Sequence, residues 1–564
     1  MHTMSLNPNH KAGTWAYGLL LGVIAAQPAL DSLTYWLMIT GRTNWVAYVR
    51  AAALGLFGLL VLVQERKPAR WGLSVAWAAY VLSKYLLAEM LLPGSGFAET
   101  SNMLRTMIAP MFTIWLFWHV REDPRRGARV ITQGLLAAAA ILAALAAASF
   151  LTGTYQTTYQ YGAGANKPDV VIGFTGWSFS PNAQSIVLSV LLGLSAPVLA
   201  RWRRPWALLG LLAAFWLMLF CHGTRTAYYS MLLMGAALLG ALTLQLPLRG
   251  RPRWWAVAAA AMFLILAFAL KPLSPLTEAE HSRDKIRNIA GYLQQGLLVP
   301  NTDPDGPMLI APPSASPGTP EPAATPAPTP SATARPADEM ARWDAQYRDH
   351  TSMFYFTQRA RDNLYSLQER SRFDSARMDA AAYEYIKERM ALPPAKIVDN
   401  RLSQSSYVIA TMRHADALRL LTGFGVTWYT DVLGSVENDY AALLGYFGLL
   451  GCAVVFGVVA WALWMSLRLV NFRCWRSVRR FFTPEILMSL AVVIMMLGLG
   501  AFSGRAFQQG STSIYLSLAL ALLYCHARQA AQEADSAVTS TQKSAMHALA
   551  KTATEQNSPS GGKL

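Results

Sequence analysis

Residues 183–246 read AQSIVLSVLLGLSAPVLARWRRPWALLGLLAAFWLMLFCHGTRTAYYSMLLMGAALLGALTLQL, and this stretch decides the fold class. It holds three apolar runs, at approximately 183–200, 205–221 and 226–246, with short polar breaks between them. A membrane-spanning helix needs roughly 20 mainly apolar residues. The stretch therefore predicts three successive spanning helices, the last two joined as a tight hairpin.

The same pattern extends over the chain and gives about twelve spanning stretches in all. The others lie at approximately 15–39, 44–63, 71–92, 101–118, 130–151, 254–270, 438–467, 485–503 and 512–526. The composition agrees, because 53% of the 564 residues are hydrophobic and only 14% are charged, which is too apolar for an ordinary soluble protein. We expect an all-α polytopic membrane protein whose first span is a retained anchor rather than a cleaved signal.

Basic residues occupy every second linker between these stretches. They are Arg66, Lys67, Arg70, Arg121, Arg125, Arg126, Arg129, Arg201, Arg203, Arg204, Arg249, Arg251, Arg253, Arg468, Arg473, Arg476, Arg479 and Arg480. The alternate short linkers carry at most one basic residue, such as Arg42 or Lys167. The positive-inside rule then places both termini in the cytoplasm of a bacterial cell. This topology accounts for the formal charge of +16 better than nucleic-acid binding does.

The linkers also define the domain organisation. We divide the chain into residues 1–270 with helices 1–9, a periplasmic loop domain at 271–436, helices 10–12 at 437–527, and a cytoplasmic disordered tail at 528–564. The loop domain contains a Pro-rich disordered insert at 311–337. Helical periodicity around the insert covers 277–297, 340–391 and 401–421. The loop before helix 10 should therefore be mainly helical.

Four cysteines lie in or beside apolar segments, and the sequence has no CxxC or Cys/His metal spacing. No disulfide framework, metal site or cofactor is expected. Ionisable residues within spans are costly and indicate functional sites. With the orientation above, eight of them fall in the outer halves of the spans or just beside them: Asp31, Arg50, Lys84, Glu89, Arg105, Arg225, Glu437 and Arg505.

This one-sided distribution favours one class of function. A transporter keeps its charged site near the midplane, whereas an enzyme acting on an interfacial lipid headgroup needs charge at one face only. The excess of arginine suits a diphosphate, because a guanidinium donates to phosphate oxygens in a bidentate fashion. Structural alternatives remain open. Arg42, Arg50 and Arg105 could snorkel to headgroups, Asp31 could be a helix-end cap or a partner for Lys84, and Lys84 could pair with Glu89.

Three local patterns follow one another in the sequence. Gly173-Phe174-Thr175-Gly176-Trp177-Ser178-Phe179-Ser180-Pro181-Asn182 ends an outer loop and enters helix 6; Gly223-Thr224-Arg225-Thr226 opens helix 8; and Gly423-Phe424-Gly425 precedes Glu437-Asn438-Asp439-Tyr440, with Leu443, Leu444, Gly448 and Gly451 beyond. Each pattern is weak alone. Their order and the topology together are specific.

Over roughly residues 100–530 these features resemble the O-antigen ligase and Wzy-type polymerase superfamily, which includes bacterial O-linked oligosaccharyltransferases. The resemblance implies transfer of a glycan from an undecaprenyl diphosphate-linked donor to a hydroxyl acceptor at the periplasmic face of the inner membrane, with no metal. Arg225 matches the family's arginine at the head of a helix, which implies donor-diphosphate binding. Glu437 stands where ligases have histidine, and Asn438 matches the asparagine that follows it.

The departure at Glu437 bears on the branch of the superfamily. A carboxylate can accept a proton from an acceptor hydroxyl, so the reaction remains feasible. The acidic residue favours an O-antigen or exopolysaccharide polymerase over a lipopolysaccharide ligase acting on lipid A-core, with O-linked oligosaccharyltransferase as a further alternative. A polysaccharide or lipid transporter is the competing class.

We therefore predict a metal-independent membrane glycosyltransferase with catalytic residues Glu437, Arg225 and Asn438. The residues predicted to bind diphosphate or glycan are Arg50, Arg105, Lys84, Asn182, Arg413 and Arg505. Arg401 is an alternative to Arg413, and His222 is more consistent with a hydrogen-bonding role than with a base. The expected partners are the undecaprenyl diphosphate-linked donor, a glycan or lipid A-core acceptor and membrane lipid, with a chain-length regulator as a candidate partner of the large loop and no nucleic acid.

Overall fold

The computed structural model of the chain describes residues 8–65, 67–91, 94, 96–161, 170–178, 180–202, 204–245, 254–278, 280, 298–299, 309–310, 400–433, 436–470 and 481–556. The Pro-rich insert 311–337, the predicted helix 340–391, nearly all of the predicted helix 277–297, and Lys167 lie outside these residues.

The described part of the chain is mainly helical. Before residue 274 the helices are α1 (Pro8–Ile39), α2 (Val46–Glu65), α3 (Pro68–Leu91), α4 (Gly96–Glu122), α5 (Pro124–Leu151), α6 (Pro181–Arg201), α7 (Pro205–Cys221), α8 (Arg225–Gln245), α9 (Trp254–Ala269) and the 3-10 helix η1 (Lys271–Leu273). After residue 399 they are α15 (Asn400–Arg413), α16 (Ala417–Thr422), α17 (Val426–Leu433), α18 (Asp439–Leu467), α20 (Pro484–Phe502) and α21 (Gly510–Gln556). Two short antiparallel hairpins pair β1 (Tyr159–Tyr161) with β2 (Val170–Ile172) and β3 (Leu298–Val299) with β4 (Leu309–Ile310).

Each of the predicted spanning stretches overlaps one of these helices. Among the described residues, eight helices are long and apolar enough to cross a membrane: α1, α2, α5, α6, α8, α18, α20 and α21. The apolar helices α7 and α9 are shorter, with 17 and 16 residues. The helices α3 and α4 are long, with 24 and 27 residues, but they carry the charged residues discussed below. The structure is thus that of a helical membrane protein.

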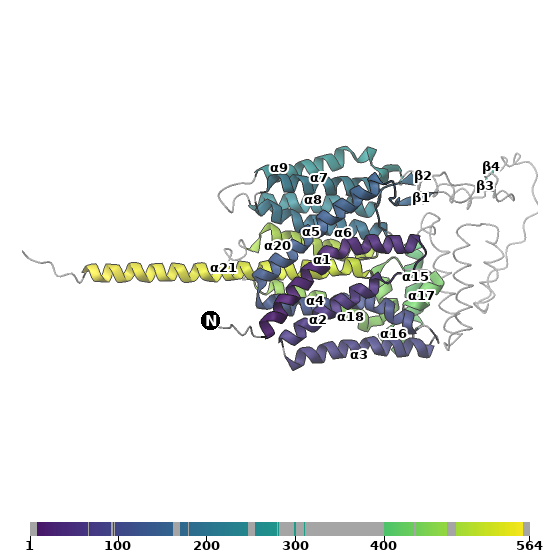
Figure 1. Cartoon of the computed structure of the whole chain (residues 1–564), viewed down its shortest axis with the longest axis horizontal. Coiled ribbons are helices and arrows are strands. Elements are labelled where there is room, and N and C mark those ends of the chain that lie inside the picture. Colours follow the sequence, from purple (N-terminus) through teal and green to yellow (C-terminus); the bar gives the residue numbers. More distant parts are fainter. Residues whose placement is uncertain are drawn as a thin grey trace, which may run out of the picture.

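The helices form a bundle with two distinct ends (Figure 1). The beginning of α1 and the long C-terminal part of α21 lie at one end, whereas α15, α16, α17 and the β1–β2 hairpin lie at the other. We call the second the capped end. The outer halves of the predicted spans, including the beginning of α2 and of α18, lie toward it.

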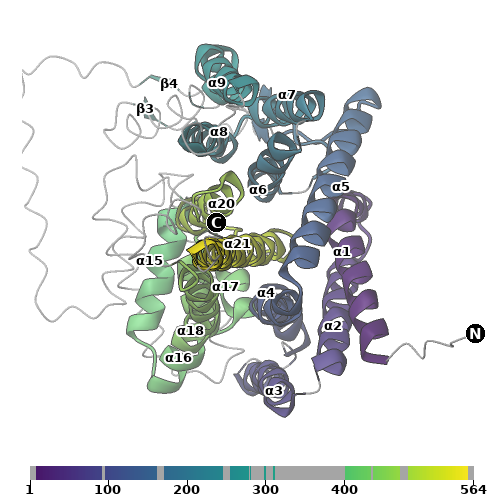
Figure 2. The same cartoon turned by 90° about the vertical axis from the view of Figure 1, so that its left-hand side faces the viewer.

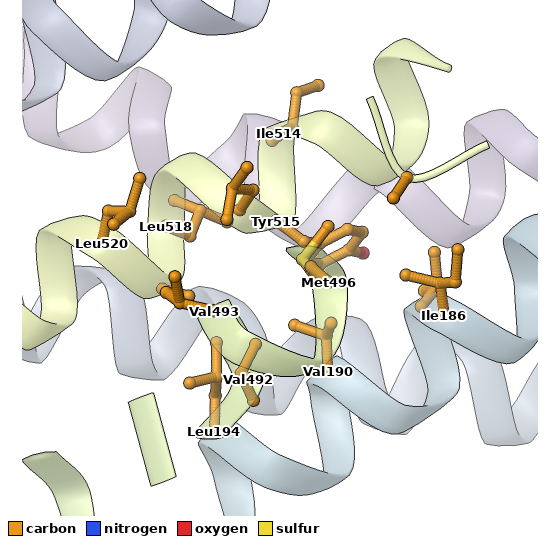
Figure 3. Close-up of a cluster of buried hydrophobic side chains, with 14 of the residues drawn as sticks. Ile186, Val190, Leu194, Val492, Val493, Met496, Ile514, Tyr515, Leu518 and Leu520 are labelled. Atoms are coloured by element: carbon orange, nitrogen blue, oxygen red, sulfur yellow. The ribbon is translucent and has the colours of Figure 1, made fainter. Parts of the chain in front are cut away.

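The first half of α21 is the centre of the bundle. It is surrounded by α4, α5, α18 and α20 (Figure 2). Apolar side chains of α6, α20 and α21 meet there, among them Val190, Val493 and Leu518 (Figure 3), and all three are completely buried. Between membrane-spanning helices such contacts are stabilised by close van der Waals packing rather than by removal of apolar surface from water.

Helix starts follow local rules of sequence. Asp123 caps α5 by accepting a hydrogen bond from the backbone N–H of Arg126 at 3.0 Å, and Thr483 caps α20 through the N–H of Ile486 at 3.3 Å. Proline occupies the first turn of both helices, where its missing N–H costs nothing. These caps fix where the chain re-enters the bundle.

Two sequence predictions need correction. The predicted disordered tail 528–564 is instead the continuation of α21 as far as Gln556, because residues 527–556 are rich in Ala and contain neither Gly nor Pro. The predicted helix 401–421 is two helices. It breaks where Asp416 accepts a hydrogen bond from the N–H of Arg419 at 2.8 Å and caps α16.

A kink in α18 shapes the capped end. At Gly448 the backbone has φ 65° and ψ −164°, a region that only glycine adopts readily. The carbonyls of Gly445 and Tyr446 accept hydrogen bonds from the N–H groups of Phe424 and Gly425 at 2.8 and 3.2 Å. The kink thereby joins the α16–α17 connection to the core of the bundle.

Gly448→Ala should destabilise the protein by about 2–3 kcal/mol, because a Cβ there would lie 2.5 Å from the nitrogen of Gly423 in a backbone conformation that strains alanine. Gly457→Ala is the matched control, since its Cβ would meet nothing within 4 Å. The unfolding midpoint in detergent, followed by tryptophan fluorescence, should fall only for the first variant. Equal midpoints would contradict a structural requirement for the kink.

Candidate functional site

A cavity of about 340 Å³ lies at the capped end, between α1, α2, α4, α5, α6 and the start of α21. Its charged lining residues are Asp31, Arg50, Arg105 and Arg505. Three of the predicted diphosphate-binding residues therefore come together, although they are far apart in the sequence. With three guanidinium groups against one carboxylate, the lining carries a net positive charge.

The rest of the lining is amphipathic. Four different helices contribute an apolar wall through Leu54, Ile108, Leu142 and Val187. Ile514, from the first turns of α21, extends this wall. Ile514 also belongs to the buried apolar cluster of Figure 3, which continues away from the cavity. The cavity thus combines cationic groups with a hydrocarbon surface.

Arg50 is held on one side only. Its Nη2 donates to Asp31 Oδ1 at 2.6 Å, and the side chains of Arg50 and Asp31 are 12% and 28% exposed. Its Nε is buried without a hydrogen-bond partner among the described residues. A buried, unpaired guanidinium N–H is costly, so Arg50 is suited to an incoming anion.

Arg105 is more exposed than Arg50, and its hydrogen bond to Asn102 is weak. Its Nη1 donates to Asn102 Oδ1 at 3.4 Å, at the long limit of a hydrogen bond. Both residues line the cavity. A guanidinium held so loosely can reorient toward a ligand.

Arg505 is placed in the cavity by a buried carboxylate. Gly504 and Arg505 have φ of 64° and 72°, and Arg505 is the only residue other than glycine with positive φ in the described chain. Asp439, which is completely buried, accepts hydrogen bonds from the backbone N–H groups of Arg505, Ala506 and Phe507 at 2.8, 2.6 and 2.9 Å. These charge-assisted bonds offset the backbone strain.

Sequence reasoning did not assign Asp439 a role. Asp439 is only one member of the sequence pattern around Glu437. Its position in the first turn of an apolar helix could have indicated a role. The structure makes Asp439 a positioning residue for Arg505.

Two other buried charges hold the wall of the cavity. Lys84, 3% exposed, donates to the carbonyls of Thr422 and of Tyr446, the second at 3.2 Å. Glu99, 2% exposed, accepts from the N–H groups of Val426 and Thr427 at 2.7 and 3.0 Å. Both Val426 and Tyr446 line the cavity. Lys84 was predicted to bind substrate, but the structure places it on backbone carbonyls outside the lining.

The residues predicted to be catalytic do not line the cavity. The Nε of Arg225 lies 3.2 Å from Glu280 Oε1, and Lys271 pairs with the same carboxylate at 3.8 Å. Asn438 caps α18 by accepting from the N–H groups of Tyr440 and Ala441, both at 3.0 Å. Its amide nitrogen donates to the carbonyl of Ala501 at 3.0 Å, so both the amide oxygen and the amide nitrogen make hydrogen bonds within the fold.

Glu437 lies beside the cavity without lining it. It is partly buried, and its backbone N–H donates to Gln404 Oε1 at 2.9 Å. The preceding carbonyl, of Val436, accepts from Gln508 Nε2 at 2.9 Å, and Gln508 does line the cavity. Among the other predicted binding residues, Asn182 lies in the first turn of α6 and Arg413 is exposed on α15, both outside the lining. The side chain of Arg401 lies outside the described residues.

Part of the first sequence pattern lines the cavity, which the sequence analysis did not predict. Gly176, Trp177, Ser178 and Ser180 line it, and Trp177 Nε1 donates to Thr154 Oγ1 at 2.9 Å. Gly173 is required for a close approach, because with φ 80° its Cβ would lie 2.4 Å from the carbonyl oxygen of His222. The loop before α6 thus closes one side of the site.

His222 belongs to a buried hydrogen-bonded group behind that loop. It is completely buried, and its Nδ1 lies 3.1 Å from Thr224 Oγ1. Burial lowers the pKa of His222 from 6.5 to about 3, so the imidazole is neutral at ordinary pH. This agrees with a hydrogen-bonding role.

No protein-family model matches this chain, and no curated protein matches it in sequence. Its interpretation rests on the fold and the cavity. Within the described ranges, no group of three or more His, Cys, Asp or Glu side chains could hold a metal ion. The fold and site define a helical membrane protein with a cationic, amphipathic cavity at one end of its bundle.

Asp439→Asn should destabilise the protein by about 2–4 kcal/mol, because an amide accepts the three backbone N–H groups less strongly than a carboxylate. The matched control is Asp416→Asn, which weakens one capping bond and should cost about 1 kcal/mol. Unfolding midpoints in detergent compare the two variants. A smaller loss for Asp439→Asn than for Asp416→Asn would contradict the role given to Asp439.

Proposed function

We propose that this protein is a bacterial inner-membrane glycan polymerase that joins oligosaccharide repeat units carried on undecaprenyl diphosphate. Donor diphosphate binds to Arg50, Arg105 and Arg505 in the cavity, and polyprenyl carbons contact its apolar wall. The observation that carries the proposal is the convergence of these three arginines, from α2, α4 and the loop before α21, on one cavity with a hydrocarbon lining.

The chemistry of the donor matches this lining. A diphosphate carries negative charge on adjacent oxygens, and guanidinium groups donate to such oxygens with charge-assisted hydrogen bonds. When the glycosidic bond to the diphosphate breaks, the charge on the leaving group grows. Preorganised arginines stabilise that developing charge, the electrostatic role that a divalent cation has in other phosphate chemistry.

The position of the cavity supports an enzyme over a transporter. A transporter alternately exposes its site to both sides of the membrane. Here the cavity lies at the capped end, and the buried side chains Val190, Val493 and Leu518 pack in the apolar core of the bundle (Figure 3). A site reached from one side suits chemistry on a lipid headgroup at the periplasmic face.

The role of Arg225 differs between the family resemblance and the cavity. The resemblance implies donor binding at Arg225, whereas the cavity favours Arg50, Arg105 and Arg505. Arg225 remains near the same end, where Glu280 and Lys271 surround it. We assign donor binding to the three cavity arginines and propose that Arg225 organises the start of α8.

Arg105→Gln should weaken binding of farnesyl diphosphate, a short polyprenyl diphosphate, by about tenfold or more, because one charge-assisted contact is lost. Arg42→Gln is the control, since Arg42 is exposed and outside the lining. Binding to the purified protein in detergent is measured by calorimetry. If Arg225→Gln abolishes binding while Arg105→Gln does not, the assignment of the donor site to the cavity is wrong.

A strain lacking the protein tests the reaction itself. Long surface glycan should disappear while single repeat units persist on the lipid carrier or on lipid A-core. Lipopolysaccharide, secreted polysaccharide and undecaprenyl-linked material are profiled together, with the wild-type gene on a plasmid as the control. Accumulation of long lipid-linked polymer beside bare core would instead identify a ligase, and accumulation of donor on the cytoplasmic side a transporter.

A further inference from the structure

We propose that Asp31 is the proton acceptor for the hydroxyl that attacks the donor, an inference that rests on the function proposed above. Asp31 is the only carboxylate among the described residues that line the cavity. It comes from the second half of α1 and lies beside Arg50, one of the arginines assigned to the donor.

One face of the Asp31 carboxylate is available to a ligand. Its Oδ1 accepts from Arg50 Nη2 at 2.6 Å, and among the described residues this is the only hydrogen bond to the side chain. The side chain is 28% exposed and lines the cavity. A hydroxyl entering the cavity can therefore donate to Oδ2 without displacing Arg50.

The presence of this carboxylate is unfavourable for anion binding alone. A negative charge beside the three arginines repels a diphosphate and reduces the net charge of the lining. A site that only held an anion would bind it more tightly without Asp31. The carboxylate is accounted for if the cavity also receives a second substrate, whose hydroxyl must lose a proton.

The other buried carboxylates at the capped end differ from Asp31 in their hydrogen bonding. Asp439 is completely buried and Glu99 is 2% exposed, and each accepts several backbone N–H groups. Their oxygens are committed to the fold. Asp31 combines access to the cavity with a carboxylate oxygen that no described donor occupies.

The step is balanced as follows. The acceptor hydroxyl oxygen forms a bond to the anomeric carbon of the donor glycan, and the bond from that carbon to the diphosphate oxygen breaks. The electron pair of the broken bond stays on the diphosphate, next to Arg50 and Arg105. The hydroxyl proton passes to Asp31 Oδ2 and then to water, which restores the carboxylate.

This assignment competes with Glu437, which stands at the position where the resembling ligases have histidine. Glu437 lies outside the lining, one residue beyond the carbonyl that accepts from Gln508. The structure favours Asp31 because it shares the cavity with the arginines. The two assignments predict opposite results for the isosteric variants Asp31→Asn and Glu437→Gln.

The experiment adds purified protein to membrane vesicles from the deletion strain, which hold the accumulated native donor, and measures the rate of glycan elongation against vesicle concentration. Asp31→Asn keeps an oxygen that accepts from Arg50 but cannot take up a proton. It should lower kcat by on the order of 100-fold or more without raising the half-saturating vesicle concentration. Farnesyl diphosphate should bind at least as tightly as it does to the wild type, because a negative charge beside the arginines is removed. Asp416→Asn, outside the cavity, should retain wild-type rates.

The pH profile separates a base from a structural ion pair. In the wild type, the rate should fall on the acidic side as the base becomes protonated, and Asp31→Glu, which keeps a carboxylate, should retain that acidic limb with partial activity. The residual rate of Asp31→Asn should lack the limb. A purely structural role would change stability or binding without removing it.

Each outcome is decisive. If Glu437→Gln loses turnover while Asp31→Asn keeps it, Asp31 is not the proton acceptor, although the proposed polymerase stands. The same holds if Asp31→Asn loses farnesyl diphosphate binding together with turnover, since Asp31 is then structural. If the wild-type protein neither binds farnesyl diphosphate nor elongates glycan in the vesicles, the proposed function itself fails.

Discussion

The carboxylate of Asp439 is the constraint on which the site depends. It is removed from water at the start of α18, and three consecutive backbone N–H groups of the loop before α21 surround it. A buried carboxylate is stable only when its charge is satisfied, so the loop is tied to α18. The same interaction holds Arg505 in a backbone conformation that a side chain rarely adopts. One interaction thereby joins α18, the central helix α21 and the cationic lining of the cavity.

Burial divides the charges of the capped end into two groups. The first group, Lys84, Glu99 and Asp439, is at most 3% exposed. These side chains bond to backbone groups that are left without helical partners by the kink at Gly448 or by loops. Arg50, Arg105 and Asp31 keep part of their surface open to the cavity. The first group holds the walls, and the second group is available for chemistry. Both groups consist of the same kinds of charged residue in apolar segments. The sequence alone therefore does not distinguish a charge that holds a wall from one that faces the cavity.

This division explains what could be predicted from the sequence. Apolar length and spacing predicted each helix of the bundle, because a span must satisfy its own backbone in a lipid environment. The one-sided distribution of charge predicted that Arg50, Arg105 and Arg505 lie near one another. Sequence alone could not separate Lys84 from them, since its role follows from carbonyls that become available at Gly448, far along the chain. Nor could it show that the amide of Asn438 would be consumed by capping α18.

The arrangement of the cavity also bears on how the two proposed substrates would meet in it. Arg50 joins the two halves of the lining, because its Nη2 binds Asp31 while its buried Nε has no partner among the described residues. The positive charge of Arg50 is delocalised over Nε and Nη2. An anion bound at Nε therefore changes the electrostatic environment of the Asp31 carboxylate at Nη2. A donor held by Arg50 would therefore lie within one side chain's width of the carboxylate that receives the acceptor hydroxyl. In the proposed reaction, Arg50 would contact the donor and the Asp31 carboxylate together, so the fold would contribute mainly by positioning the two reactants.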